Sequence, residues 1–323
     1  MIIDRLFSGG IITNYYCTSK CAHCLYACAP SRERKFMDEE TARRAMLKIR
    51  SMGCYSFHIG GGEPMLDLEG LTAVARVAKE TGMSVEYVET NSSWYRDEDR
   101  AVQILAKLME TGIRQLLVSI SPFHNAHIPF YKVKGVLQAC RKSGMQVFPW
   151  IMNFYADIDA FDDRRTHTME EYRERYGQDY QAGIPLRYWT HLGGRAVQAY
   201  KEIFPLKSLE SILESPACHE LTDTSHFHID LYGNYIPGLC SGLTIRMEDL
   251  GLQLGENEYP LITMLFEQGI SAFLEYAKRE YGFIPDEKYL NKCHLCNDIR
   301  YFLYAGKYVR SIEMQPEGYY QDN

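Results

Sequence analysis

Three cysteines near the N-terminus, Cys17, Cys21 and Cys24, have the spacing C-x3-C-x2-C and follow a short apolar run. Thiolates this close along the chain are expected to converge on one centre. Four cysteines would complete the ligand set of a cubane iron–sulfur cluster, so three leave one iron open to an outside ligand, where chemistry can occur. The spacing differs from the C-x2-C pairs of zinc ribbons, although a zinc site is the alternative for these residues.

A second motif, Gly60-Gly61-Gly62-Glu63-Pro64, follows the strand-like residues 55–59. Together the two motifs resemble the radical S-adenosylmethionine (radical SAM) superfamily, whose signature is C-x3-C-x2-C followed by a Gly-Gly-Glu strand end. The resemblance implies a [4Fe–4S] cluster on the three cysteines. It also implies reductive cleavage of S-adenosylmethionine, with an electron donor such as a flavodoxin or ferredoxin, to a 5′-deoxyadenosyl radical that takes a hydrogen atom from the substrate.

Five residues are expected to contact S-adenosylmethionine. The resemblance implies that Gly61, Gly62 and Glu63 hold its amino end, since a carboxylate accepts hydrogen bonds from an ammonium group and glycines allow close backbone approach. Asn91 and Ser119, near the ends of two predicted strands, are expected to contact the ribose or the carboxylate.

The remaining cysteines form a C-terminal set and three singletons. In a chain with no export signal, cysteines favour metal or redox chemistry over disulfides. Four thiolates saturate either a zinc ion or a cubane cluster, and ligand count does not separate the two. The set consists of Cys218, Cys240, Cys293 and Cys296.

The segment around the second cysteine of this set resembles the start of a SPASM/Twitch auxiliary-cluster domain. It runs Tyr232-Gly233-Asn234-Tyr235-Ile236-Pro237-Gly238-Leu239-Cys240, with more residues between Gly233 and Cys240 than the usual pattern has. Four cysteines fit the shorter Twitch form, which holds one cluster. The resemblance therefore implies a second [4Fe–4S] cluster, and the run Gly193–Ala196 resembles the link that precedes such a domain.

No catalytic residue is identified from the sequence. The singletons Cys28, Cys54 and Cys140 are typical of small buried side chains. Cys28, nearest the cluster cysteines, is the candidate hydrogen-atom donor. His23 is expected to pack beside the cluster, and His124 and His127 either face the substrate or are ordinary loop histidines.

Strand-like and helix-like segments alternate in units of about 30 residues that end in glycine, the pattern of βαβ repeats. We predict an α/β fold: a partial (β/α)6 TIM-like barrel over residues 8–205, followed by a small auxiliary-cluster domain over 206–323. Predicted strands include residues 146–153 and a sixth at 186–189, with a polar excursion or lid at 155–179. A hairpin is expected at 226–235 and a helix at 264–279.

The net charge of −7 argues against a surface that binds nucleic acid through its phosphates. No apolar run approaches a membrane span, and the N-terminus lacks a signal-peptide pattern, so we expect a cytoplasmic protein. The leading function is net oxidation of a small molecule. The alternatives are modification of a ribosomal peptide, by epimerisation or cross-linking, and a non-catalytic iron–sulfur electron carrier, which would not need Glu63 and its glycines.

Overall fold

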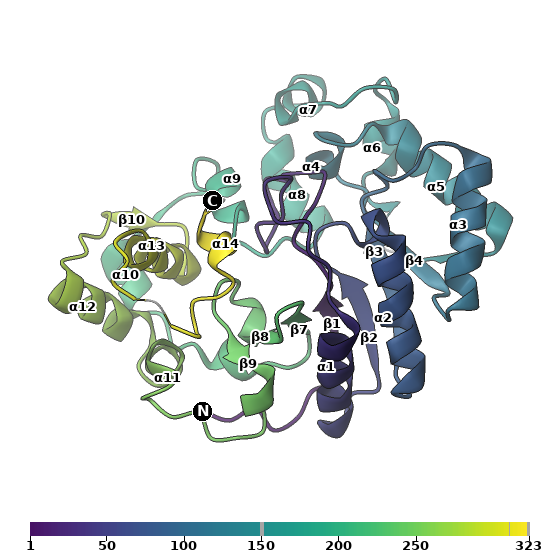
Figure 1. Cartoon of the computed structure of the whole chain (residues 1–323). Coiled ribbons are helices and arrows are strands. Elements are labelled where there is room, and N and C mark those ends of the chain that lie inside the picture. Colours follow the sequence, from purple (N-terminus) through teal and green to yellow (C-terminus); the bar gives the residue numbers. More distant parts are fainter. Residues whose placement is uncertain (149–151, 310, 322–323) are drawn as a thin grey trace.

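The computed structural model of the chain describes residues 1–148, 152–309 and 311–321. Within them, an eight-stranded sheet has the order β5-β4-β3-β2-β1-β7-β8-β9, and β6 and β10 form a separate pair (Figure 1). The strands are β1 (Gly9–Ile12), β2 (Ser56–Gly60), β3 (Ser84–Thr90), β4 (Gln115–Val118), β5 (Gln146–Val147), β6 (Lys207–Ser208), β7 (Phe227–Asp230), β8 (Asn234–Ile236), β9 (Ile245–Arg246) and β10 (Lys288–Tyr289).

Parallel pairing runs from β5 to β7, while β8 and β9 are antiparallel. This is the mixed α/β architecture, dominated by parallel strands, of a partial TIM-like barrel, as the repeats predicted. Parallel strands need crossover connections, and helices supply them here. The helices are α1 (Glu39–Ser51), α2 (Leu68–Glu80), α3 (Glu98–Glu110), α4 (Pro122–Asn125), α5 (Phe130–Ser143), α6 (Tyr155–Asp159), α7 (Met169–Tyr176), α8 (Tyr180–Arg187), α9 (Ala196–Tyr200), α10 (Leu209–Leu213), α11 (Pro260–Glu267), α12 (Gly269–Tyr281), α13 (Lys292–Ala305) and α14 (Glu317–Gln321).

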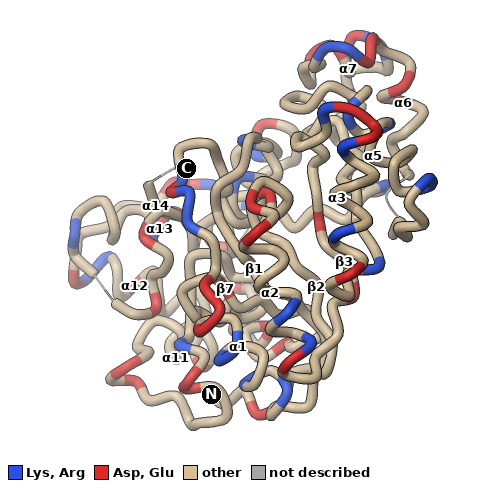
Figure 2. Tube along the Cα trace, turned by 45° about the vertical axis from the view of Figure 1, so that its right-hand side comes forward, with Lys and Arg blue, Asp and Glu red and all other residues tan. Residues whose placement is uncertain are grey.

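The first three crossover helices begin in the same way. Asp38, Asp67 and Asp97 are their N-caps, and each side chain accepts a hydrogen bond from the backbone N–H three residues on. Such a cap satisfies an otherwise unpaired donor and stabilises a helix by about 1 kcal/mol. Figure 2 shows acidic and basic residues interspersed along the traces of helices such as α2 and α7.

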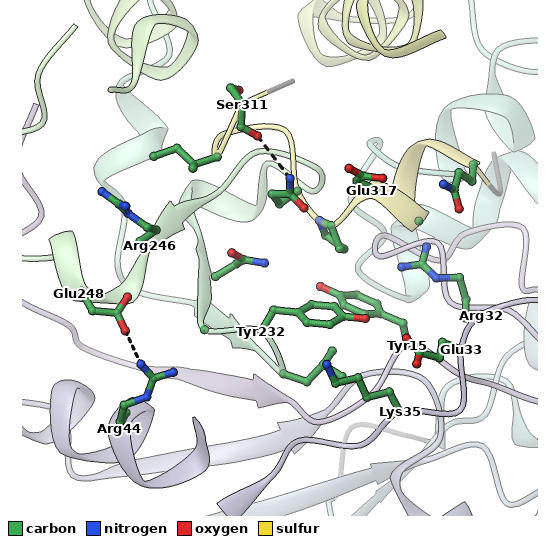
Figure 3. A pocket seen from close by; sticks show the side chains of 18 of the residues that line it. Tyr15, Arg32, Glu33, Lys35, Arg44, Tyr232, Arg246, Glu248, Ser311 and Glu317 are labelled. Atoms are coloured by element: carbon green, nitrogen blue, oxygen red, sulfur yellow. Dashed lines mark hydrogen bonds and ion pairs between the residues drawn. The ribbon is translucent and has the colours of Figure 1, made fainter. Parts of the chain in front are cut away.

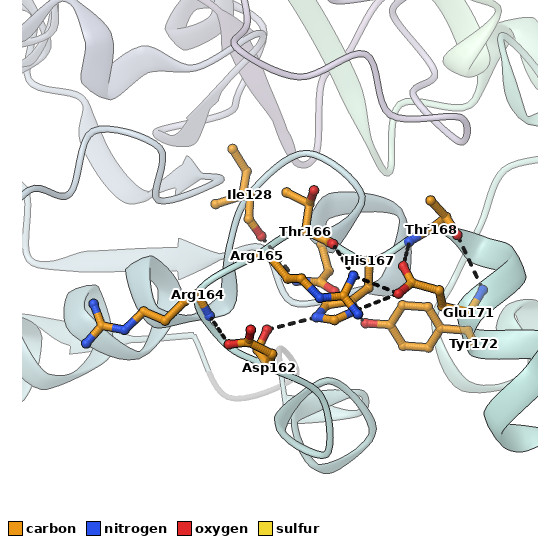
Figure 4. Close-up of polar contacts among 10 residues, drawn as sticks. Ile128, Asp162, Arg164, Arg165, Thr166, His167, Thr168, Glu171 and Tyr172 are labelled. Atoms are coloured by element: carbon orange, nitrogen blue, oxygen red, sulfur yellow. Dashed lines mark hydrogen bonds and ion pairs between the residues drawn. The ribbon is translucent and has the colours of Figure 1, made fainter.

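The predicted polar excursion at residues 155–179 is more regular than expected, because it contains α6 and α7. Thr168 and Glu171 form a reciprocal capping box at the start of α7. Glu171 also lies 2.7 Å from Arg165, and the backbone N–H of Thr168 and that guanidinium lower its pKa to about 2 (Figure 4). The S/T-x-x-E pattern at 168–171 predicts this cap.

The predicted sixth strand at residues 186–189 is wrong. Residues up to Arg187 belong to α8. The sixth parallel strand is instead β7, which pairs with β1 on the side away from β2. Gly9 allows this pairing, because a Cβ there would lie 2.2 Å from the carbonyl oxygen of Phe227.

The division into domains at residues 205 and 206 stays a prediction, since β7 lies in the second segment yet joins the sheet of the first. The expected hairpin is present as β7 and β8, with Gly233 at φ +81° in its turn. The helix expected at 264–279 is two helices, α11 and α12, separated at Gln268. The predicted strand at 146–153 is described only as β5, and residues 149–151 lie outside the described part.

Across the described residues, helices are all too short or too polar to cross a membrane.

Candidate active site at the carboxyl ends of the parallel strands

The three N-terminal cysteines lie on the loop after β1 and line one cavity of about 620 Å³. Cys17 and Cys21 are buried and Cys24 is half-buried. Burial raises the pKa of Cys17 to about 12 and raises that of Cys21, which is also raised by the nearby Cys24 and Cys17. Thiolates at these positions therefore require a bound cation, which deprotonates a coordinating thiol.

Two hydrogen-bond donors lie beside the sulfur of Cys17. The side-chain amide of Asn91 donates to Cys17 Sγ at 3.3 Å, and the backbone N–H of Ser19 donates at 3.4 Å. Cys24 shares a hydrogen bond with Cys28, which lowers the pKa of Cys24 to about 6. Three converging thiols with N–H donors aimed at sulfur fit an iron–sulfur cluster that is ligated by three cysteines.

Arg195 binds two backbone carbonyls of the cysteine loop. This role was not predicted from the sequence. Its Nε donates to the carbonyl of Cys21 at 3.1 Å, and its Nη2 donates to that of Cys28 at 2.6 Å. Nη1 is buried without a hydrogen-bond partner among the described residues. The preceding residue, Gly194, lets the chain pass close to the cysteine loop. Its φ is +53°, and a Cβ at this position would lie only 2.5 Å from the carbonyl oxygen of Leu25, so a larger residue would not fit.

Four of the five residues expected to contact S-adenosylmethionine line this cavity: Gly61, Gly62, Asn91 and Ser119. Glu63 does not. Its carboxylate is fully buried and accepts hydrogen bonds from Thr90 Oγ1 (2.8 Å), the Asn91 N–H (2.6 Å) and the Met65 N–H (3.2 Å). Burial outweighs these donors and raises its pKa to about 7. Glu63 thus fastens the end of β3 and positions Asn91.

The rest of the cavity is rich in polar groups that the sequence did not single out. Tyr87 and Glu89 lie two residues apart on β3, and both side chains line the cavity. Tyr26 and Tyr188, from other segments, line it as well. The Glu89 carboxylate contacts the cavity, but the protein atoms around it reduce its hydration. This desolvation raises the pKa of Glu89 to about 7. Period-two alternation on β3 is the sequence signal that places Tyr87 and Glu89 on one face.

The three candidate histidines differ in their surroundings. His23 is stacked on Phe123, with ring centroids 4.6 Å apart, which matches the packing role expected for it. His124 lines the cavity and its Nδ1 lies 2.7 Å from the hydroxyl of Ser121. His127 is exposed and does not line the cavity.

The C-terminal cysteines also converge, around a small cavity lined by all four thiols. Cys218 and Cys240 flank the β7–β8 hairpin, and Cys293 and Cys296 lie in the first turns of α13. Beside them the buried Arg300 donates to the Ser241 carbonyl at 2.9 Å, and its Nε has no hydrogen-bond partner among the described residues. Leu25 and Gly194, which adjoin the first cysteine set, form part of the wall of this second cavity.

A larger cavity, of about 960 Å³, lies elsewhere and contains none of the predicted site residues (Figure 3). Tyr15 and Tyr232 stack in it with ring centroids 6.4 Å apart, and Lys35 lies over Tyr232. Its charges are mixed, and Arg44 forms an ion pair with Glu248 at its edge. The chemistry-bearing residues gather in the smaller cavity, which we take as the candidate active site.

A family model described as the radical SAM superfamily matches residues 11–165. This segment, a little under half of the chain, is a radical SAM domain. The match spans the cysteine loop, the glycine motif and strands β2 to β5. Such a domain implies an enzyme that uses a [4Fe–4S] cluster and S-adenosylmethionine.

Among solved structures, the chain is similar to BtrN in complex with AdoMet and 2-DOIA (15% identity, 83% of this chain and 90% of that one, TM-score 0.44). It is also similar to anSMEcpe with bound AdoMet (14%, 93% and 97%, TM-score 0.46). A third is SuiB of Streptococcus suis bound to precursor peptide SuiA (14%, 84% and 66%, TM-score 0.36). A search of curated proteins gives no match.

Proposed function

We propose that this radical SAM enzyme oxidises a small polar molecule that binds in the 620 Å³ cavity beside Cys17, Cys21 and Cys24. The observation that carries the proposal is the lining of this cavity. The lining combines the three cysteines with carboxylates, phenols and imidazoles, and with apolar side chains such as Leu25, Leu117 and Leu239. Such a lining suits a compact substrate with several hydroxyl or amino groups.

The protein's own residues would bind and orient the reactants. Bound there, the cluster and S-adenosylmethionine supply a carbon radical that removes a hydrogen atom from the substrate. Gly61 and Gly62 would hold the cosubstrate through their backbone atoms, with Asn91 fixed by Glu63 behind them. Once a hydrogen atom has left, oxidation of the substrate requires the further loss of one electron and one proton. Glu89, a carboxylate of the cavity lining with a pKa raised to about 7, would accept the proton.

The electron needs an acceptor, and the C-terminal cysteines are suited to provide one. Cys218, Cys240, Cys293 and Cys296 would hold a second, fully ligated [4Fe–4S] cluster in a Twitch-like domain. Two features support this: the four thiols converge, and Leu25 and Gly194 lie between this cavity and the loop of the first set. A zinc ion in this place would leave the electron without that acceptor.

Peptide modification by epimerisation is the second candidate, and the position of Cys28 is what favours it. Cys28 lines the active-site cavity, whereas among the described residues Cys54 and Cys140 do not. A thiol at this position could return a hydrogen atom to a peptide carbon radical. Oxidation of a small molecule needs no returned hydrogen.

In the experiment that tests the proposal, wild-type enzyme and Cys28→Ala are each incubated with candidate substrates that carry deuterium on carbon. Deuterium in 5′-deoxyadenosine and the oxidation state of the product are then measured. Oxidation predicts deuterium in 5′-deoxyadenosine, a product two electrons more oxidised than the substrate, and full product formation by Cys28→Ala. A product of unchanged oxidation state, formed by wild type but not by Cys28→Ala while 5′-deoxyadenosine still accumulates, would instead establish epimerisation.

A further inference from the structure

Three histidines meet on one face of the sheet, at the wall of the active-site cavity. His58 lies on β2, His228 lies on β7, and His226 comes two residues before it. One ring nitrogen from each lies within 4.8 Å of the others. His58 and His228 are 2% and 5% exposed, while His226 is half-buried and lines the cavity.

The register of the sheet explains why these rings meet. Gly10 of β1 is the direct neighbour of His58 on one side and of His228 on the other. Aligned residues of neighbouring strands point to the same face, and so do residues two apart on one strand. Since Gly10 has no side chain, the rings close over β1: a Cβ at Gly10 would lie 2.3 Å from Nε2 of His58.

The three imidazoles are held in the neutral form that binds metals. Burial lowers the pKa of His58 to about 3 and also lowers those of His226 and His228. The groups that face them are few. Glu89 Oε1 lies 4.0 Å from His58 Nε2, and the charges of Asp223 and Glu86 act on His226 without restoring its ordinary pKa.

Outer hydrogen bonds orient two of the rings in the way that metal-binding histidines are oriented. Nδ1 of His228 lies 2.8 Å from the hydroxyl of Tyr26, and the ring of His58 hydrogen-bonds to the backbone of Gly9. Tyr87 stacks on His58, with an interplanar angle of 7°, and fixes its plane.

The spacing of the inner nitrogens suits one ion. Nε2 of His58 and Nε2 of His228 are 3.0 Å apart. Bonds of about 2.0–2.1 Å from one ion place neighbouring nitrogens roughly 3.0–3.4 Å apart. The ring of His226 is stacked on that of His58, with centroids 5.2 Å apart and an interplanar angle of 12°, so it must turn about its side-chain bonds to complete the set.

We propose that His58, His226 and His228 bind a divalent first-row transition-metal ion in the wall of the active-site cavity. Imidazole ligands suit such ions, and three protein ligands leave a position open. That position faces the cavity, with Glu89 beside it, and would take a hydroxyl or carboxylate oxygen of the substrate. This last role rests on the proposed function, whereas metal binding itself does not.

Zinc is the probe, because X-ray absorption at its edge is blind to the iron of the clusters. Cluster-loaded protein is given one equivalent of Zn²⁺, and the zinc spectrum and dissociation constant are measured. We expect a first shell of nitrogen and oxygen at about 2.0–2.1 Å with imidazole scattering, and no sulfur at about 2.3 Å. His226→Ala should weaken zinc binding at least tenfold, whereas the exposed His127→Ala should not change it.

Three outcomes would overturn the proposal: no bound zinc, a sulfur shell that places zinc on cysteines, or unchanged affinity in His226→Ala. Such a result would leave the three histidines as a hydrogen-bonded network only. The wild-type spectrum decides the question even if the variant does not fold. Because zinc binding is read without turnover, its failure is distinct from a failure of the proposed function, which would appear as absent oxidation by protein that binds zinc normally.

Discussion

At the scale of single residues, Glu63 acts through its neighbours, because its carboxylate is enclosed by three donors from the protein. Its pKa is raised by burial from an ordinary 4.5 to about 7. The folded state thus favours the protonated form. The stability contribution of Glu63 is full below about pH 4.5 and is lost as the pH rises towards 7.

Glu63→Gln tests this placement. Glutamine turns its NH₂ group towards a backbone N–H, a mismatch that costs about 1–3 kcal/mol at any pH. We expect wild type to melt above the variant at pH 5 and the gap to narrow by pH 8, since glutamine does not titrate. Glu86→Gln, an exposed change on β3, is the control. A gap that does not vary with pH would show that Glu63 does not titrate in this range.

Arg195→Lys tests the support of the cysteine loop. A lysine keeps the charge but has one nitrogen, so it cannot reach the carbonyls of both Cys21 and Cys28. Charge-assisted hydrogen bonds are worth about 1.5–3 kcal/mol, so we expect cluster retention to weaken about tenfold or more, measured as iron per chain during chelator challenge. Arg34→Lys, exposed on the same loop, should retain iron like wild type, and equal retention by Arg195→Lys would rule out the support role.

Residue types and spacing were enough to predict the two groups of cysteines and the glycines of the cavity. They could not predict the direction of the Glu63 side chain, because burial at a strand end depends on the neighbouring strand. Arg195 and the three histidines were missed for the same reason. Arg195 and its partner Cys21, and His58 and His228, are more than 150 residues apart in the sequence. The sequence alone also does not show that Gly10 of β1 lies between His58 and His228, because this depends on the register of the strands.

At the scale of elements, the βα units were predictable because α1, α2 and α3 each have an aspartate cap, and because a glycine follows the end of each of these helices and of α5. The prediction of a sixth strand at 186–189 was wrong, because β7 takes that place in the sheet. β7 also forms, with β8, the hairpin between Cys218 and Cys240. A short apolar run at 186–189 carries no signal that separates a strand from the end of α8. Pairing across more than 200 residues is decided by tertiary contacts.

Thr168→Ala tests the capping box of α7. The lost cap is expected to lower the local stability of this helix by about 1 kcal/mol, so the amides of α7 should exchange with deuterium about fivefold faster. Thr166→Ala, just outside the cap, is the matched control and should leave exchange in α7 unchanged. Equal exchange in both variants would mean that the cap does not hold this helix (Figure 4).

At the scale of the whole molecule, the proposed function divides the chemistry between a first cysteine set that generates a radical and a second that receives an electron. Replacing the four C-terminal cysteines with serine should remove about four irons per chain and stop product formation, while some uncoupled cleavage of S-adenosylmethionine continues. Iron and zinc are measured by elemental analysis. Loss of one zinc with no change in iron would make this set a structural zinc site.

The most direct test of the account is cleavage of S-adenosylmethionine by anaerobically reconstituted protein with dithionite, followed by mass spectrometry. Wild type should yield 5′-deoxyadenosine and methionine. A variant with Cys17, Cys21 and Cys24 all replaced by alanine should yield neither, while it keeps the iron of the second set. Undiminished cleavage by that variant would contradict the assignment of the radical-generating site to these three cysteines.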